Sequence, residues 1–131
     1  MLHPSQFSLN EVWILFRLNN SPVCTEENGD FHVVCLMDAA SCYILGTELF
    51  SVESASVPEA VAAKLMEAAV NQSNVVPGQI YISSTLPAED AQPLLAESAI
   101  KVSIIPDNEL LPFLSEAREG FLEHVGGGRV Q

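Results

Sequence analysis

The feature that most constrains the fold is a short segment whose side chains are apolar on both faces. Residues 11–18 read EVWILFRL. In an extended chain, Ile14 and Phe16 would share one face, and Trp13 would point to the other. A strand that is apolar on both sides belongs in a sheet that is covered on both faces. We therefore expect a sheet flanked by helices, which is an α/β fold.

Four further strands and three helices are predicted from alternation, helical spacing and turn residues. The strands are expected at residues 31–37, 42–50, 79–83 and 100–105, and the helices at 58–71, 87–98 and 108–125. The short connection between the strands at 31–37 and 42–50 predicts an antiparallel hairpin. The last two strands, each preceded by a helix, should run parallel to a neighbouring strand. The expected fold is one mixed five-stranded sheet with the order β-β-β-α-β-α-β-α.

Several residues predict where helices begin. The segment Ser56-Val57-Pro58-Glu59 has the spacing of a capping box for the first helix. Ser84 or Thr85 would cap the second helix, in which Pro93 should either kink the helix or delay its start. Asp107 is the expected N-cap of the last helix.

The length of 131 residues and the 48% hydrophobic content predict a single domain, residues 1–131, with one core. Polar residues at about 21–30 and the glycine-containing tail at 126–131 are expected to be flexible. Gly46, inside a predicted strand, indicates a bulge or a close contact. No apolar run approaches the roughly 20 residues of a membrane span, and the N-terminus lacks the pattern of a signal peptide. We expect a cytoplasmic protein without membrane contact.

The charge balance is strongly acidic. The net charge is −12, and the basic residues form no run; they are Arg17, Lys64, Lys101, Arg118 and Arg129. Proteins that bind nucleic acids draw most of their affinity from lysine and arginine on phosphates. Such a chain should repel DNA, RNA and anionic membranes, so nucleic acid is not an expected partner.

Cysteines and histidines give no metal or redox motif. The three cysteines, Cys24, Cys35 and Cys42, have no CxxC spacing, so we expect reduced, buried thiols. His3, His32 and His124 lie far from one another and have no neighbour at ligand spacing. We expect structural roles for these histidines and no cofactor.

The order of the elements and parts of the sequence resemble the ribonuclease H-like catalytic core of integrases and transposases. The resembling stretch runs from Trp13 through the hairpin Val33–Gly46, the helix from Pro58 and the Pro77-Gly78-Gln79-Ile80 entry into the fourth strand, and ends at Pro106. The resemblance implies a three-layer sandwich. It also implies where a catalytic centre would lie.

In that family, an Asp on the first strand, an Asp after the fourth strand and a carboxylate on the last helix hold two divalent metals. Here the first-strand position falls within Ile14-Leu15-Phe16, and the position after the fourth strand falls at Ser83-Ser84. Only the last helix offers carboxylates, Glu109 and Glu116, and one carboxylate cannot hold a metal pair. The resemblance therefore implies a scaffold whose catalytic centre is absent.

Three functional hypotheses follow. The first is a non-catalytic domain that acts through protein contacts, either with a partner or with a second copy through the exposed edge of the third strand. The second is a divergent metal-dependent nuclease with a site rebuilt from Asp38, Asp107 and Glu109, although Asp38 is expected to serve a tight turn. The third is a small-molecule module at the carboxyl ends of the parallel strands. The candidate ligand-site residues are Ser83, Ser84, Thr85, Asp107 and Glu109.

Overall fold

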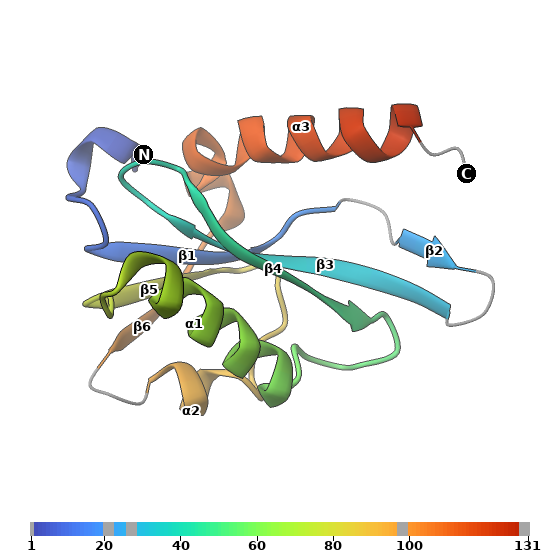
Figure 1. The fold of residues 1–131 in the computed structure, drawn as a ribbon, viewed down its shortest axis with the longest axis horizontal. Coiled ribbons are helices and arrows are strands. Elements are labelled where there is room, and N and C mark those ends of the chain that lie inside the picture. Colours follow the sequence, from blue (N-terminus) through green and yellow to red (C-terminus); the bar gives the residue numbers. More distant parts are fainter. Residues whose placement is uncertain (1, 20–22, 26–28, 97–99, 129–131) are drawn as a thin grey trace.

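The computed structural model describes residues 2–19, 23–25, 29–96 and 100–128 as an α/β fold built on one mixed sheet (Figure 1). The strands are β1 (Val12–Arg17), β2 (Val23–Thr25), β3 (Gly29–Asp38), β4 (Ile44–Ser51), β5 (Gln79–Ser83) and β6 (Lys101–Ile105). The helices are α1 (Glu59–Ser73), α2 (Gln92–Leu95) and α3 (Leu111–Gly128), with the 3₁₀ turns η1 (Pro4–Gln6) and η3 (Asp107–Glu109). Among the described residues, no helix is both long enough and apolar enough to cross a membrane.

The sheet joins an antiparallel half to a parallel half through β1. Its order is β2-β3-β1-β5-β6, and β4 pairs with β3. β3 runs antiparallel to β1 and β4, whereas β5 runs parallel to β1 and β6. The predicted hairpin and the predicted parallel strands are confirmed.

The strand β2 corrects the prediction of a flexible loop over residues 21–30. Residues 23–25 pair antiparallel with the start of β3, in the register Val23↔Phe31 and Thr25↔Gly29. Within the described residues, the sheet therefore has six strands rather than five. A three-residue strand has too little alternation to be read from sequence, and it forms because the long β3 offers it an edge. Residues 20–22 and 26–28 of the predicted loop lie outside the described part.

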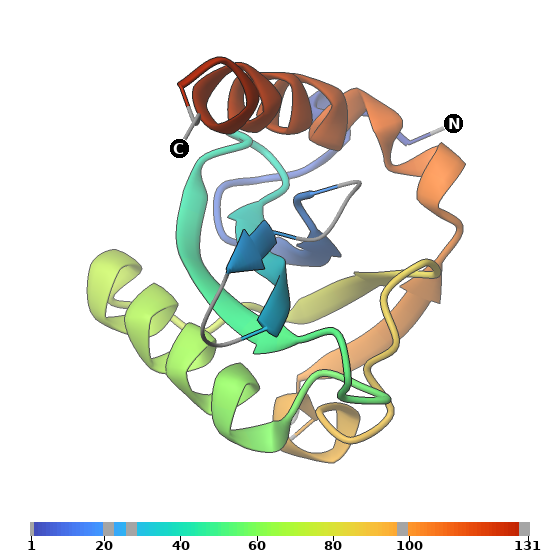
Figure 2. The same cartoon turned by 90° about the vertical axis from the view of Figure 1, so that its right-hand side faces the viewer.

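The two faces of the sheet carry separate hydrophobic cores. The sequence of β1 predicts two covered faces, but the expectation of one core is wrong, because the sheet separates the two clusters. Trp13 and Leu15 pack under α1 and α2 on one face, and Ile14 and Phe16 pack under α3 on the other. Figure 2 shows α3 on one side of the sheet and α1 with α2 on the opposite side.

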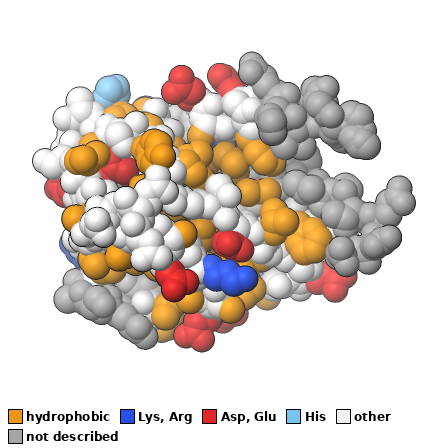
Figure 3. Space-filling view, in the orientation of Figure 1, with side chains coloured by type: hydrophobic (Ala, Val, Ile, Leu, Met, Phe, Trp, Pro, Cys, Tyr) orange, Lys and Arg blue, Asp and Glu red, His pale blue; other side chains and the backbone are white. Residues whose placement is uncertain are grey.

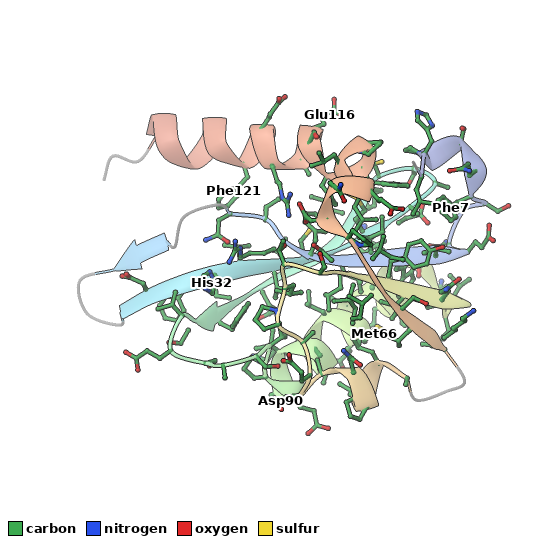
Figure 4. The ribbon with its side chains drawn as sticks, turned by 180° about the vertical axis from the view of Figure 1, so that it is seen from behind. Phe7, His32, Met66, Asp90, Glu116 and Phe121 are labelled. Carbon is green, nitrogen blue, oxygen red and sulfur yellow. The ribbon has the colours of Figure 1, made fainter. Side chains whose placement is uncertain are left out.

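The N-terminal segment helps α3 to cover its face of the sheet. The ring of Phe7 lies 5.9 Å from that of Phe113 and 6.0 Å from that of Tyr81. Phe121 lies between α3 and the sheet, whereas Met66 lies on the opposite side of the sheet (Figure 4). β1 is consequently enclosed on both sides.

Helix α1 starts close to the predicted position, but the prediction of a capping box at its start is wrong. Its N-cap is Pro58, which makes no side-chain capping bond. The hydroxyl of Ser56 instead accepts the backbone N–H of Asp90 at 3.1 Å, which ties the loop before α1 to the segment before α2. Asn74, in the left-handed region at φ 62°, ends the helix.

Helix α2 is shorter than the predicted 87–98. It begins at Gln92 with Ala91 as its N-cap, so neither Ser84 nor Thr85 caps it. Pro93 falls in the first turn, where its missing N–H does no harm, so the proline delays the start of the helix. Residues 97–98 lie outside the described part.

Helix α3 begins later and ends later than predicted. η3 precedes it, so Asp107 is not its N-cap, and residues 126–128 are helical rather than a flexible tail. The last three residues, 129–131, lie outside the described part.

Gly46 allows the close approach of α1 to β4. The β3–β4 register shifts between Leu36↔Gly46 and Met37↔Ile44, which is the bulge that the glycine indicated. A Cβ on Gly46 would stand 3.5 Å from Cδ2 of Leu65 and 3.6 Å from Cβ of Ala68. Only a small residue therefore fits under the helix at this position.

Candidate functional site

The candidate site lies where the parallel strands end. β1, β5 and β6 terminate at Arg17, Ser83 and Ile105, and parallel strands present their carboxyl ends at one edge of a sheet. The backbone N–H of Ser84 donates to the carbonyl of Ile105 at 2.9 Å, which holds the two following loops together. The sequence predicted ligand-site candidates at this edge.

Four of the five candidate residues are joined in one hydrogen-bond network. Oδ1 of Asp107 accepts the hydroxyl of Ser83 at 2.5 Å and that of Thr85 at 3.3 Å. The hydroxyl of Ser84 accepts the backbone N–H of Asp107 at 3.1 Å. The hydroxyls of Ser83, Ser84 and Thr85 thus all bond to the side chain or the backbone of Asp107.

Arg118, on α3, completes the network. Its guanidinium donates to Oδ2 of Asp107 at 3.0 Å and to Oδ1 at 3.1 Å, and it also donates to the carbonyl of Arg17 at 3.0 and 3.2 Å. Its Cζ lies 5.7 Å from the ring centre of Phe16, within the range of a cation–π contact. We call Ser83, Ser84, Thr85, Asp107 and Arg118 the Asp107 latch. The latch joins the ends of β1, β5 and β6 to α3.

Sequence reasoning missed Arg118, although a signal was present. Arg118 lies four residues after Leu114 and three before Phe121, within the apolar stripe of the last helix. A cation inside such a stripe needs a buried partner, because an unpaired charge is costly to bury. That requirement would have directed attention to an acidic residue at the edge of the sheet.

The electrostatics of the latch keep Asp107 ionised. The hydrogen bonds from Arg118 hold the pKa of Asp107 below its usual range, with help from Ser83 and against the opposing effect of burial. The side chains of Arg118 and Asp107 are only 16% and 21% exposed. Oδ1 accepts three of the four contacts on the carboxylate, and Oδ2 accepts the fourth. Both oxygens of Asp107 are thus engaged by groups of the chain itself.

The remaining carboxylates do not join the latch. Glu109 lies on η3 and is exposed, and it is not among the partners of Asp107. Glu116 is also exposed (Figure 4), and its charge acts on Cys42 in the β3–β4 turn. The last helix thus contributes a cation rather than a carboxylate to this edge.

Asp38 lies at the opposite end of β1. It pairs with Trp13, whereas the latch contacts the carbonyl of Arg17, about 13 Å further along a strand. Asp38 accepts the backbone N–H of Asn10 at 2.7 Å and both the N–H and the hydroxyl of Ser41, at 2.9 and 2.7 Å. The interpretation of Asp38 as a turn residue is confirmed, and Asp38, Asp107 and Glu109 do not share a site.

The described residues include no group of three or more His, Cys, Asp or Glu side chains that is placed to hold a metal. Cys35 and Cys42 are free thiols, and burial raises the pKa of Cys35 to about 12. The pKa of Cys42 is also raised, first by burial and then by Asp38 and Glu116. Both sulfurs are consequently protonated at neutral pH, while the side chain of Cys24 lies outside the described part.

The two histidines whose side chains are described make local contacts, His3 at the surface and His32 partly buried. His3 caps η1 by accepting the N–H of Ser5 at 3.3 Å. The ring of His32 lies 5.3 Å from that of Phe50, and burial, followed by the charge of Arg17, lowers the pKa of His32. The side chain of His124 lies outside the described part.

Comparisons with known proteins add no assignment. No protein-family model matches the chain, and no curated protein matches it in sequence. Functional inference therefore depends on the arrangement of the residues themselves.

Proposed function

We propose that this chain is a non-catalytic domain of ribonuclease H-like architecture that acts through contacts with protein partners. The architectural part draws support from the order of the elements. Three antiparallel strands, β4, β3 and β1, are followed by two helix-preceded parallel strands, β5 and β6, between helical layers on both faces. The resembling enzymes place their catalytic centre where the first strand, the fourth strand and the last helix meet.

The observation that carries the proposal is the position of Arg118. The ends of β1 and β5 and the helix α3 meet through its guanidinium, which bonds the Arg17 carbonyl and Asp107. Asp107 itself holds Ser83. A metal pair needs several carboxylates at one point, whereas here a fixed cation already neutralises the one carboxylate of the network. The latch stabilises the fold at the position where the resembling enzymes carry out chemistry.

The charge of the chain and the exposed side chains of its edge strands support contacts with proteins. A net charge of −12 opposes binding to nucleic acid and anionic membranes, and Figure 3 shows acidic side chains spread over the face that carries α1. Both β4 and β6 lie at edges of the sheet, and each has a half-exposed apolar side chain, Leu49 and Ile104. Edge strands with exposed apolar side chains are a common route to pairing with another chain.

Two measurements test the proposal. Calorimetric titration of the full chain with Mg²⁺ should give no saturable heat in the micromolar range; a micromolar site would overturn the non-catalytic part. Affinity capture with chemical cross-linking, from extract of the cells that produce the chain, should yield a protein that binds the purified chain directly. Failure of every captured protein to bind in purified form would overturn the second part.

A further inference from the structure

A pocket of about 340 Å³ lies at the end of β1 opposite the latch. The N-terminal loop, the β3–β4 turn and the last turn of α1 line this open pocket. Its lining includes Leu9, Asn10, Asp38, Tyr43, Leu45 and Gln72. Ligand pockets span about 300–1,000 Å³, so this one has room for a single side chain or a very small molecule. Figure 3 shows hydrophobic and acidic side chains together at the left-hand end of the face that carries α1.

The electrostatic field in the pocket favours a cation. Asp38 is one of the lining residues and is only 1% exposed, so its charge is weakly screened by solvent. Its carboxylate accepts hydrogen bonds from Asn10 and Ser41, which are neutral donors and leave its negative charge in place. Gln72 and Ser73 bring the C-terminal end of α1, a helix of 15 residues, to the same pocket. The C-terminal end of a helix carries partial negative charge. By contrast, the guanidinium of Arg118 lies at the far end of β1, where it donates to the backbone carbonyl of Arg17.

The walls suit the stem of a long basic side chain. Leu9 and Tyr43 are 70% and 56% exposed at the pocket, and Leu45 forms part of its apolar wall. Lysine and arginine lay their methylene stems along apolar surface, and their charged heads are attracted to aromatic faces. Gln72 donates its amide N–H to the phenol oxygen of Tyr43 at 2.7 Å, which fixes the ring at the pocket.

We propose that this pocket receives a lysine or arginine side chain from a basic segment of a protein partner. The inference rests on the proposed function and deepens it by stating the chemistry of the partner. Charge complementarity with a chain of net charge −12 favours a basic segment. The small volume favours one inserted side chain over a larger ligand.

The first test is an NMR titration of the ¹⁵N-labelled full chain with a ten-residue peptide of alternating lysine and serine. We expect saturable shifts at the amides of Asn10, Ser41 and Gln72. A peptide with norleucine in place of lysine keeps the apolar stem without the charge and should bind about tenfold more weakly. Equal binding of the two peptides, or shifts spread over the whole surface, would overturn the inference. Binding of n-butylammonium as tightly as the lysine peptide would overturn the partner segment in favour of a free amine.

The second test uses the variant Gln72→Lys, which places a cation of the chain itself at the pocket. It should weaken binding of the lysine peptide about tenfold or more. Asn71→Lys is the matched control, because it adds the same charge to the next exposed position of α1, outside the pocket lining. Equal weakening by both variants would show a general charge effect and overturn the pocket.

The same pair of variants separates this inference from the proposed function. A captured partner that binds wild type and Asn71→Lys but not Gln72→Lys supports both. A partner that binds all three equally leaves the proposed function standing and overturns the pocket as its docking site. Absence of any direct partner overturns the proposed function, while the peptide titration still decides whether the pocket accepts a cation.

Discussion

Replacing Arg118 with methionine should destabilise the domain without disturbing the packing of its stem. The change removes four hydrogen bonds, two of them to Asp107, and the contact with the ring of Phe16. Asp107 would keep its bonds to Ser83 and Thr85 but would lose its counter-charge.

The magnitude follows from the partial burial of the pair. Exposed ion pairs contribute about 0–1 kcal/mol, and breaking a fully buried pair costs about 3–5 kcal/mol. The side chains of Arg118 and Asp107 are 16% and 21% exposed, which places the pair between these limits. We expect a loss of about 2–3 kcal/mol in the free energy of unfolding, or a decrease in Tm of roughly 10 °C for a domain of this size.

Urea denaturation followed by circular dichroism measures this loss, and Lys64→Met is the matched control. Lys64 is exposed on α1 and is no member of the latch, so its replacement should change the free energy by less than about 0.5 kcal/mol. The reasoning would be refuted by equal unfolding midpoints for the two variants. Adding Asp107→Asn to Arg118→Met should restore part of the loss, because no unpaired charge then remains.

Three other predictions concern single groups. Because the folded-state pKa of Asp107 is depressed, the stability it contributes should be complete above its unfolded pKa of about 3.9 and be lost as pH falls through the lower folded value. The stability difference between wild type and Asp107→Asn should therefore shrink below about pH 4 in urea titrations; a constant difference would contradict this. Cys35, with a pKa of about 12 and no exposure, should resist iodoacetamide at pH 8 until the chain is unfolded, as peptide mass spectrometry can show. Gly46→Ala should be tolerated because its Cβ would meet Leu65 and Ala68 at ordinary contact distances, whereas Gly46→Leu should destabilise the fold by about 1–3 kcal/mol in the same urea assay.

The sequence predicted the parts of the fold that depend on long-range burial. The two apolar faces of β1 predicted a sheet that is covered on both faces, and Trp13 and Ile14 belong to different hydrophobic cores. The local signals were less reliable. The prediction of a capping box at Ser56 was wrong because its hydroxyl accepts the backbone N–H of Asp90, a residue far away in the sequence. Asp107 failed as a helix cap because its carboxylate is held by Arg118.

The candidate site could be placed but not interpreted from sequence. Ser83 and Asp107 follow parallel strands, so their meeting at one edge was predictable. The identity of the third partner was not, because the register of α3 over the sheet is set by packing rather than by local pattern. Only the structure brings Arg118 to Asp107, and this contact converts a possible ligand site into an internal ion pair.

The most direct test of the account is whether the edge formed by Ser83, Ser84, Thr85 and Asp107 holds a divalent metal. Mn²⁺ is paramagnetic and broadens the NMR signals of amides near a bound ion, so a titration of the ¹⁵N-labelled chain reports the location as well as the affinity. A closed Asp107 latch predicts only weak, diffuse broadening that follows the acidic surface. Selective loss of the Ser84, Thr85 and Asp107 amide signals at micromolar Mn²⁺ would contradict it and would indicate a metal centre.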